Sequence, residues 1–123
     1  MAEALRILIA DDQPRARKSL RALLSTWSRV LEVREAGNGR EAVQLVAELQ
    51  PGLVLMDVRM PEVDGLEAAR MIKAQWPHVK IVVLSMYSEH RDEALAAGAD
   101  AFVGKGEAAE ELLGTLEELL KAV

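Results

Sequence analysis

Apolar residues along this chain follow two alternating patterns. Short, nearly continuous apolar runs occupy residues 5–10, 30–35, 53–56, 80–84 and 101–103. Runs of this length that are bounded by charged or turn residues are typical of buried strands. We therefore predict five strands.

Longer segments between these runs repeat apolar residues every three or four positions, which is the spacing of an amphipathic helix. The four clearest stripes are Leu20, Leu23, Leu24 and Trp27; Ala42, Leu45, Val46 and Leu49; Leu66, Ala69, Ile72 and Trp76; and Leu112, Leu113, Leu116, Leu119, Leu120 and Val123. Residues 89–97 also have a helical pattern but carry few apolar anchors. We expect that segment to be the most loosely held helix.

Alternating strands and helices, with strands apolar on both faces, are typical of a parallel sheet covered by helices on each side. The prediction is a doubly wound α/β sandwich. In such sheets, functional sites lie at the carboxyl ends of the strands, near the point where the strand order reverses. The residues that follow each strand are therefore the candidates for function.

The composition limits the classes of function. A chain of 123 residues predicts one domain, residues 1–123, and no apolar run approaches the ~20 residues of a membrane span. There is no cysteine, and the start of the chain has no secretory signal pattern, so we expect a cytoplasmic protein. The net charge of -5 argues against direct binding of nucleic acid.

Polar residues that suit one chemistry follow four of the predicted strands. Asp11 and Asp12 follow the first strand, Asp57 the third, Ser85 the fourth and Lys105 the fifth. Two carboxylates ~4 Å apart repel by ~4 kcal/mol at an effective dielectric constant near 20, so three converging acids need a proton or a cation. Mg²⁺ is a hard ion that suits such oxygen ligands.

Each of these residues also has an ordinary interpretation. Asp11 and Asp12 can be helix-capping acids, Asp57 a turn acid, Ser85 a strand-end hydroxyl and Lys105 a solvated loop lysine. Their coincidence at four strand ends favours a functional site. A carboxylate at the end of a rigid strand can act as a nucleophile toward phosphorus, in a reaction that depends on positioning and charge neutralisation.

Over essentially its whole length the chain resembles a response-regulator receiver domain of two-component signalling. The resemblance is carried by Asp11-Asp12, by "DVRMPEVDG" from Asp57, by Ser85 and by "FVGK" ending at Lys105. The segment "IVVLSMYSEHRDEALAAGADAFVGK" most resembles the sequences of receivers that precede a LuxR-type helix-turn-helix domain, as in nitrate regulators. The resemblance implies a flavodoxin-like five-stranded parallel sheet in the order 2-1-3-4-5.

The resemblance also implies that Asp57 accepts a phosphoryl group from the phosphohistidine of a sensor histidine kinase. Asp11, Asp12 and Asp57, together with the backbone carbonyl of Arg59, would hold Mg²⁺. The chain would then be no enzyme beyond catalysing its own phosphorylation and dephosphorylation.

The same resemblance implies how the domain would respond to phosphorylation of Asp57. Lys105 would pair with the phosphoryl group, the Ser85 hydroxyl would move to hydrogen-bond it, and Phe102 would turn inward as the aromatic switch. The face formed by residues 89–97, the fifth strand and the last helix would then contact a downstream output protein or domain, or a second copy in a homodimer. The chain would be a stand-alone receiver or the receiver part of a DNA-binding regulator.

Three other functions fit the residues less well. A flavin-nucleotide carrier needs a phosphate-binding loop where Asp11 and Asp12 stand. A degenerate receiver would have lost the acids or the lysine, and a phosphatase would need a substrate pocket of its own. The two histidines, His78 and His90, are predicted to be solvated surface residues that serve neither as metal ligands nor as bases.

Overall fold

Strands and helices alternate throughout the computed structural model, which describes residues 5–107 and 109–121. The elements are β1 (Leu5–Ala10), α1 (Pro14–Leu24), β2 (Val30–Ala36), α2 (Gly39–Leu49), β3 (Leu53–Asp57), α3 (Gly65–Gln75), β4 (Lys80–Ser85), α4 (His90–Ala96), β5 (Ala101–Gly104) and α5 (Ala109–Lys121). All five predicted strands are present. The last four end one residue later than predicted, so Asp57 and Ser85 are the final residues of their strands.

The strands form one parallel sheet in the order β2-β1-β3-β4-β5. The predicted flavodoxin-like order is therefore confirmed. The strand order reverses between β1 and β3, which are adjacent in the sheet although β2 separates them in the chain. Connections from these two strands leave in opposite directions, and the crevice between them opens beside Asp11 and Asp57.

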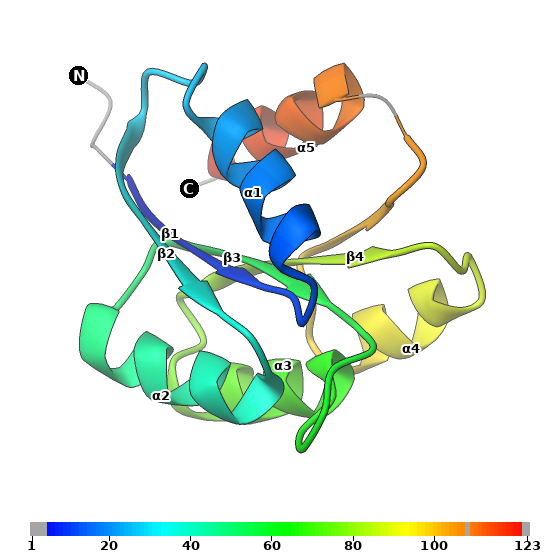
Figure 1. Ribbon diagram of the computed structural model, residues 1–123. Helices are drawn as coiled ribbons and strands as arrows, with labels where there is room; N and C mark the ends of the chain where they lie inside the picture. The colour runs from blue at the N-terminus through cyan, green and yellow to red at the C-terminus, as the bar shows by residue number, and fades with distance from the viewer. Residues whose placement is uncertain (1–4, 108, 122–123) are drawn as a thin grey trace.

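Helices cover both faces of the sheet (Figure 1): α1 and α5 lie on one face, and α2, α3 and α4 lie on the other. Alternate residues of each strand point to opposite faces, so each strand contributes to two cores. Ile9 and Leu55 pack with the α1 and α5 layer, whereas Leu8 and Met56 pack with the other three helices. The apolar strands predicted from the sequence are buried on both sides for this reason.

Helix α4 is the shortest helix within the described residues. It has seven residues, and Ala94 is its one fully buried side chain, in keeping with the few apolar anchors of its sequence. None of the helices within residues 5–107 and 109–121 combines the length and apolar character that a bilayer-crossing segment needs. The predicted last position of the α5 stripe, Val123, lies outside the described residues.

Candidate functional site

Three carboxylates meet at the carboxyl edge of the sheet. One oxygen from each of Asp11, Asp12 and Asp57 can be chosen so that all three lie within 4.8 Å of one another. Asp11 is buried, Asp57 is half-buried and Asp12 is exposed. The predicted convergence of the acids is thus present in the geometry.

Local hydrogen bonds fix Asp11 in place. Its Oδ1 accepts the backbone N–H of Gln13 at 2.9 Å, and its carbonyl oxygen accepts a hydrogen bond from Arg17 Nη1 at 2.7 Å. The N-cap of α1 is Gln13, whose side chain makes no capping bond. Asp11 therefore stabilises the turn into α1 through Oδ1, while its Oδ2 pairs with Lys105 Nζ.

Lys105 is the cation that offsets the acids. Its Nζ lies 2.8 Å from Asp11 Oδ2 and 3.3 Å from Asp57 Oδ1. Burial alone would lower the pKa of Lys105, but the hydrogen bond to Asp11 and the charges of Asp57 and Asp11 raise it. The ammonium is therefore firmly charged, and it sits closer to Asp11 than to the strand-end acid.

Asp57 keeps an unfavourable charge in spite of this contact. Burial, followed by the charge of Asp11, raises its pKa above the ordinary value of 3.8, and the opposing effect of Lys105 is smaller. One ammonium thus faces three carboxylates and leaves the cluster short of positive charge. Because carboxylate oxygens are the ligands that Mg²⁺ prefers, the donor set fits this ion.

The Ser85 hydroxyl lies in a hydrogen-bonded turn beside the acids. Its Oγ accepts the backbone N–H of Tyr87 at 3.0 Å and lies 2.7 Å from His90 Nδ1. Ser85, Asp57 and Lys105 line the same hollow of about 370 Å³. The backbone carbonyl of Ser85 also accepts the N–H of Lys105 at 2.8 Å, which joins the two loops.

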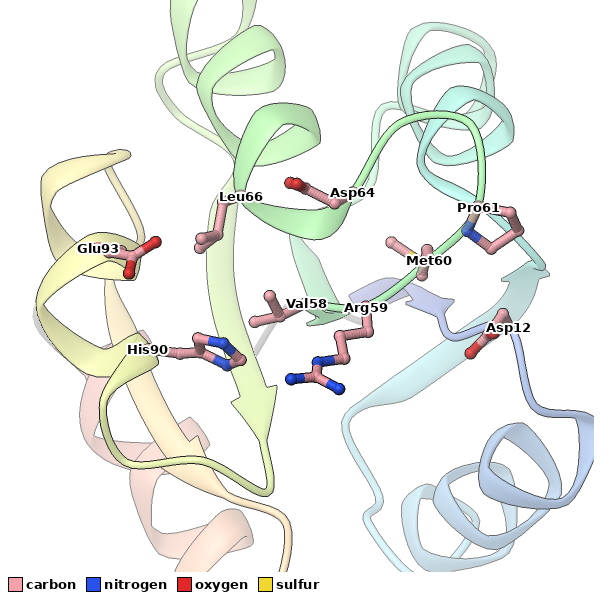
Figure 2. A pocket seen from close by; sticks show the side chains of 9 residues that line it. All are labelled: Asp12, Val58, Arg59, Met60, Pro61, Asp64, Leu66, His90 and Glu93. Carbon is pink, nitrogen blue, oxygen red and sulfur yellow. The ribbon is translucent and has the colours of Figure 1, made fainter.

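A second hollow, of about 630 Å³, opens between the β3–α3 loop and α4 (Figure 2). The side chains of Asp12, Arg59 and His90 extend into it from three different segments. Arg59 is exposed, and its guanidinium lies 4.6 Å from the centre of the Tyr87 ring. The side chain of Arg59 thus points toward α4, while its carbonyl belongs to the loop that follows Asp57.

Phe102 lies away from the acids. Its ring is partly buried against the core that α2, α3 and α4 share with the sheet, and the guanidinium of Arg91 lies 5.6 Å from the ring centre. Phe102 therefore contacts α4 and not the carboxylate cluster. The structure brings Asp11, Asp12, Asp57, Ser85 and Lys105 together. Phe102 lines a separate hollow of about 300 Å³, to which Ser85 and Lys105 also contribute.

Comparison with known protein families decides the relationship. Residues 7–117 match the family model described as the response regulator receiver domain. The chain belongs to this family. The resemblance first drawn from the strand-end motifs is therefore confirmed, and the receiver is the part of a two-component response regulator that the chain represents.

Individual relatives agree with this placement. The receiver is 43% identical over 113 residues to an uncharacterized transcriptional regulatory protein, YhcZ, of Bacillus subtilis, covering 90% of this chain and 53% of that protein. It is 34% identical over 110 residues to the response regulator protein VraR of Staphylococcus aureus, covering 88% and 53%. The chain thus spans about half the length of the curated relatives it matches.

Solved structures give the same result. A LuxR-family two-component response regulator from Aurantimonas superposes with a TM-score of 0.91 at 31% identity, covering 98% of this receiver and 87% of that chain. The signal receiver domain of the putative response regulator NarL from Mycobacterium tuberculosis superposes with a TM-score of 0.90 at 27% identity, covering 98% and 99%. The expected likeness to receivers of LuxR-type response regulators is confirmed.

One residue of the site was missed from the sequence. His90 was predicted to be a solvated surface residue, but its imidazole is half-buried and contacts the Ser85 hydroxyl. The tight turn before α4 places it there, because the N–H of His90 bonds the carbonyl of Tyr87 at 3.1 Å. His78, by contrast, is exposed as predicted. No periodic pattern in the sequence around His78 or His90 distinguishes the two histidines.

Proposed function

We propose that this receiver is a phosphorylation-controlled switch and that Asp57 is its phosphoacceptor. The observation that carries the proposal is the meeting of Asp57 with Asp11, Asp12 and Lys105 at the strand ends. The donor would be a phosphohistidine of a sensor histidine kinase. An Asp57 oxygen attacks phosphorus, the phosphorus–nitrogen bond breaks, and the histidine nitrogen leaves with the electron pair.

The side chains of the site have distinct tasks in this step. Asp11, Asp12 and Asp57, with the Arg59 carbonyl, would hold Mg²⁺, which when bound neutralises charge on the transferring phosphoryl oxygens. Lys105 already bridges Asp11 and Asp57, so its ammonium needs only a small movement to donate to a phosphoryl oxygen. Dephosphorylation is a separate hydrolysis: water attacks phosphorus, the bond to the Asp57 oxygen breaks, Asp57 leaves as the carboxylate, and inorganic phosphate is released.

The structural change after phosphorylation would pass from Asp57 to Ser85 and then to Phe102. Ser85 turns its hydroxyl toward the phosphoryl group, and Phe102 turns inward into the space that is vacated. The surface formed by α4, β5 and α5 changes as a result, and it would contact an output partner or a second copy. The few buried contacts of α4 support this assignment, because weakly anchored elements reorganise at low cost.

We further propose that residues 1–123 form one receiver domain that acts in the cytoplasm, with no direct contact to nucleic acid. Its relatives include transcriptional regulators about twice as long as the matched segment, which supports a role as the receiver part of a DNA-binding regulator. The alternative is that the chain acts as a stand-alone receiver. In either role, the chain would catalyse only its own phosphorylation and dephosphorylation.

The test is intact mass spectrometry after incubation with acetyl phosphate and Mg²⁺. We expect one added phosphoryl group in the wild type, none in Asp57→Asn, and none when Mg²⁺ is chelated. Asp64→Asn is the matched control, because Asp64 lies in the same loop and caps α3, a task that asparagine also performs. Full labelling of Asp57→Asn, or an unlabelled wild type, would overturn the proposal.

A further inference from the structure

The hydroxyl of Ser85 has a single proton, and the structure indicates where that proton goes. A serine hydroxyl donates one hydrogen bond and accepts up to two. Ser85 Oγ already accepts the N–H of Tyr87, and its other neighbour is His90 Nδ1 at 2.7 Å. The residue is only 3% exposed.

Two arrangements of the Ser85–His90 contact are possible. If Nδ1 carried the imidazole proton, Ser85 Oγ would accept two bonds and its own buried proton would have no partner among the described residues. If Nδ1 is bare, Ser85 donates to it and every polar atom of the contact is satisfied. Because a buried unsatisfied donor is costly, the second arrangement is favoured, with the imidazole proton on Nε2.

The imidazole is held for this contact by a chain of side chains. The Tyr87 ring meets the His90 ring edge-on, with 5.6 Å between ring centres and an interplanar angle of 75°. The guanidinium of Arg59 lies over the Tyr87 ring, 4.6 Å from its centre. Figure 2 shows the His90 and Arg59 side chains extending into the same hollow. His90 is therefore braced against Ser85 by its surroundings.

We propose that His90 is a positioning residue that holds the Ser85 hydroxyl in the unphosphorylated state and competes for it with the phosphoryl group. The inference rests on the proposed phosphorylation of Asp57. A hydroxyl that donates its one proton to His90 cannot donate it to a phosphoryl oxygen as well. Phosphorylation must therefore break the Ser85–His90 bond, and the strength of that bond sets how readily the switch responds.

The test measures binding of beryllofluoride, a phosphoryl mimic, with Mg²⁺ at about pH 8, above the ordinary titration range of an imidazole. His90→Phe keeps a ring against Tyr87 but removes the acceptor, and it should tighten binding about fivefold, the worth of one hydrogen bond. His90→Asn places a carbonyl oxygen where Nδ1 stands and should restore wild-type affinity. His78→Phe, on the exposed histidine, is the matched control and should change nothing.

The decisive comparison makes the His90→Phe substitution in a protein that lacks the Ser85 hydroxyl. In Ser85→Ala, His90→Phe should leave the affinity unchanged, because the competition no longer exists. An equal gain with and without Ser85 would refute the competition and leave His90 a merely structural residue. A wild type that binds no beryllofluoride would refute the proposed function itself, a result distinct from an unchanged affinity in His90→Phe.

The hydrogen bond can also be observed without any phosphoryl mimic. Long-range proton–nitrogen NMR correlations of the imidazoles should place the His90 proton on Nε2, and Ser85→Ala should shift the His90 Nδ1 signal but not the signals of His78. A His90 proton found on Nδ1 in the resting protein would overturn the proposal, whatever the outcome of the binding experiment.

Discussion

Replacing Lys105 by methionine tests the electrostatic interpretation of the site. Methionine keeps an apolar stem of similar length but removes the ammonium that lies 2.8 Å from Asp11 and 3.3 Å from Asp57. At an effective dielectric constant near 20, each of these contacts corresponds to about 5 to 6 kcal/mol of attraction. The variant loses both contacts and leaves the three acids facing one another.

The net loss of stability is smaller than the sum of these attractions. The desolvation cost of the Lys105 ammonium disappears together with its charge, and its side chain is 22% exposed, so solvent already screens part of the attraction. Removing one partner of a buried pair costs about 3 to 5 kcal/mol, and an exposed pair about 1 kcal/mol or less. We therefore expect a loss of about 2 to 3 kcal/mol at neutral pH without Mg²⁺.

The dependence on pH and Mg²⁺ distinguishes this loss from ordinary destabilisation. Folding raises the pKa of Asp57, so the ionised acid costs stability above its unfolded value of 3.8 and costs nothing once protonated. Without Lys105 this penalty grows. The deficit of Lys105→Met should therefore shrink as the pH falls toward about 4, and Mg²⁺ should stabilise the variant more than the wild type.

Urea unfolding with and without Mg²⁺ measures these effects, as a midpoint lowered by about 1 M or more in the variant at about pH 7. Lys73→Met is the matched control, because Lys73 pairs with Asp100 at 2.7 Å and its side chain is mostly buried, as that of Lys105 is, yet it lies outside the acidic cluster. Its deficit should not respond to Mg²⁺. Equal responses of the two variants to Mg²⁺ would refute the idea that Lys105 offsets a shared excess of negative charge.

Two further predictions concern the frame around the site. The hydrogen bond from Arg21 lowers the pKa of Glu35 below its ordinary value of 4.5, so Glu35→Gln should cost about 1 kcal/mol of stability at neutral pH. In urea titrations this difference should persist above the ordinary value and be lost as the pH falls through the lowered pKa of the folded protein. A Cβ at Gly65 would lie 1.8 Å from the Asp57 carbonyl oxygen, so Gly65→Ala should lower the free energy of unfolding by about 3 kcal/mol. Gly114 lies on α5 with open space around it, so Gly114→Ala should raise the free energy of unfolding by up to about 1 kcal/mol. Equal effects of the two alanines would contradict this account of the β3–α3 loop.

Much of the fold can be predicted from the order of apolar and polar residues along the sequence. The strands are apolar on both faces because helices cover both sides of a parallel sheet, and this leaves near-continuous apolar runs such as residues 53–56. The carboxyl ends of parallel strands share one edge, so strand assignment alone predicts that Asp11, Asp57 and Ser85 lie close together. Strand bounds shifted by one residue because the pairing of Asp57 with Leu84 continues past the last apolar side chain of β3.

The contacts within the site could not be predicted in the same way. The closer approach of Lys105 to Asp11 than to Asp57 depends on loop geometry, which no periodicity encodes. The position of His90 depends on a four-residue turn between β4 and α4, where every intervening side chain is exposed. The close packing of Gly65 against the Asp57 carbonyl likewise depends on the path of the β3–α3 loop, although a glycine at that point was part of the family motif.

The hydrogen bonds around Ser85 explain how a change at Asp57 can reach α4 without deforming the sheet. The backbone carbonyl of Ser85 holds the N–H of Lys105, and its hydroxyl holds His90, the first residue of α4. If phosphorylation draws the hydroxyl away from His90 as proposed, α4 would keep the burial of Ala94 and the contact of Arg91 with the Phe102 ring. Because packed cores resist small continuous deformation, release of one hydrogen bond at a weakly anchored helix is a more economical route to a new surface than movement of the strands.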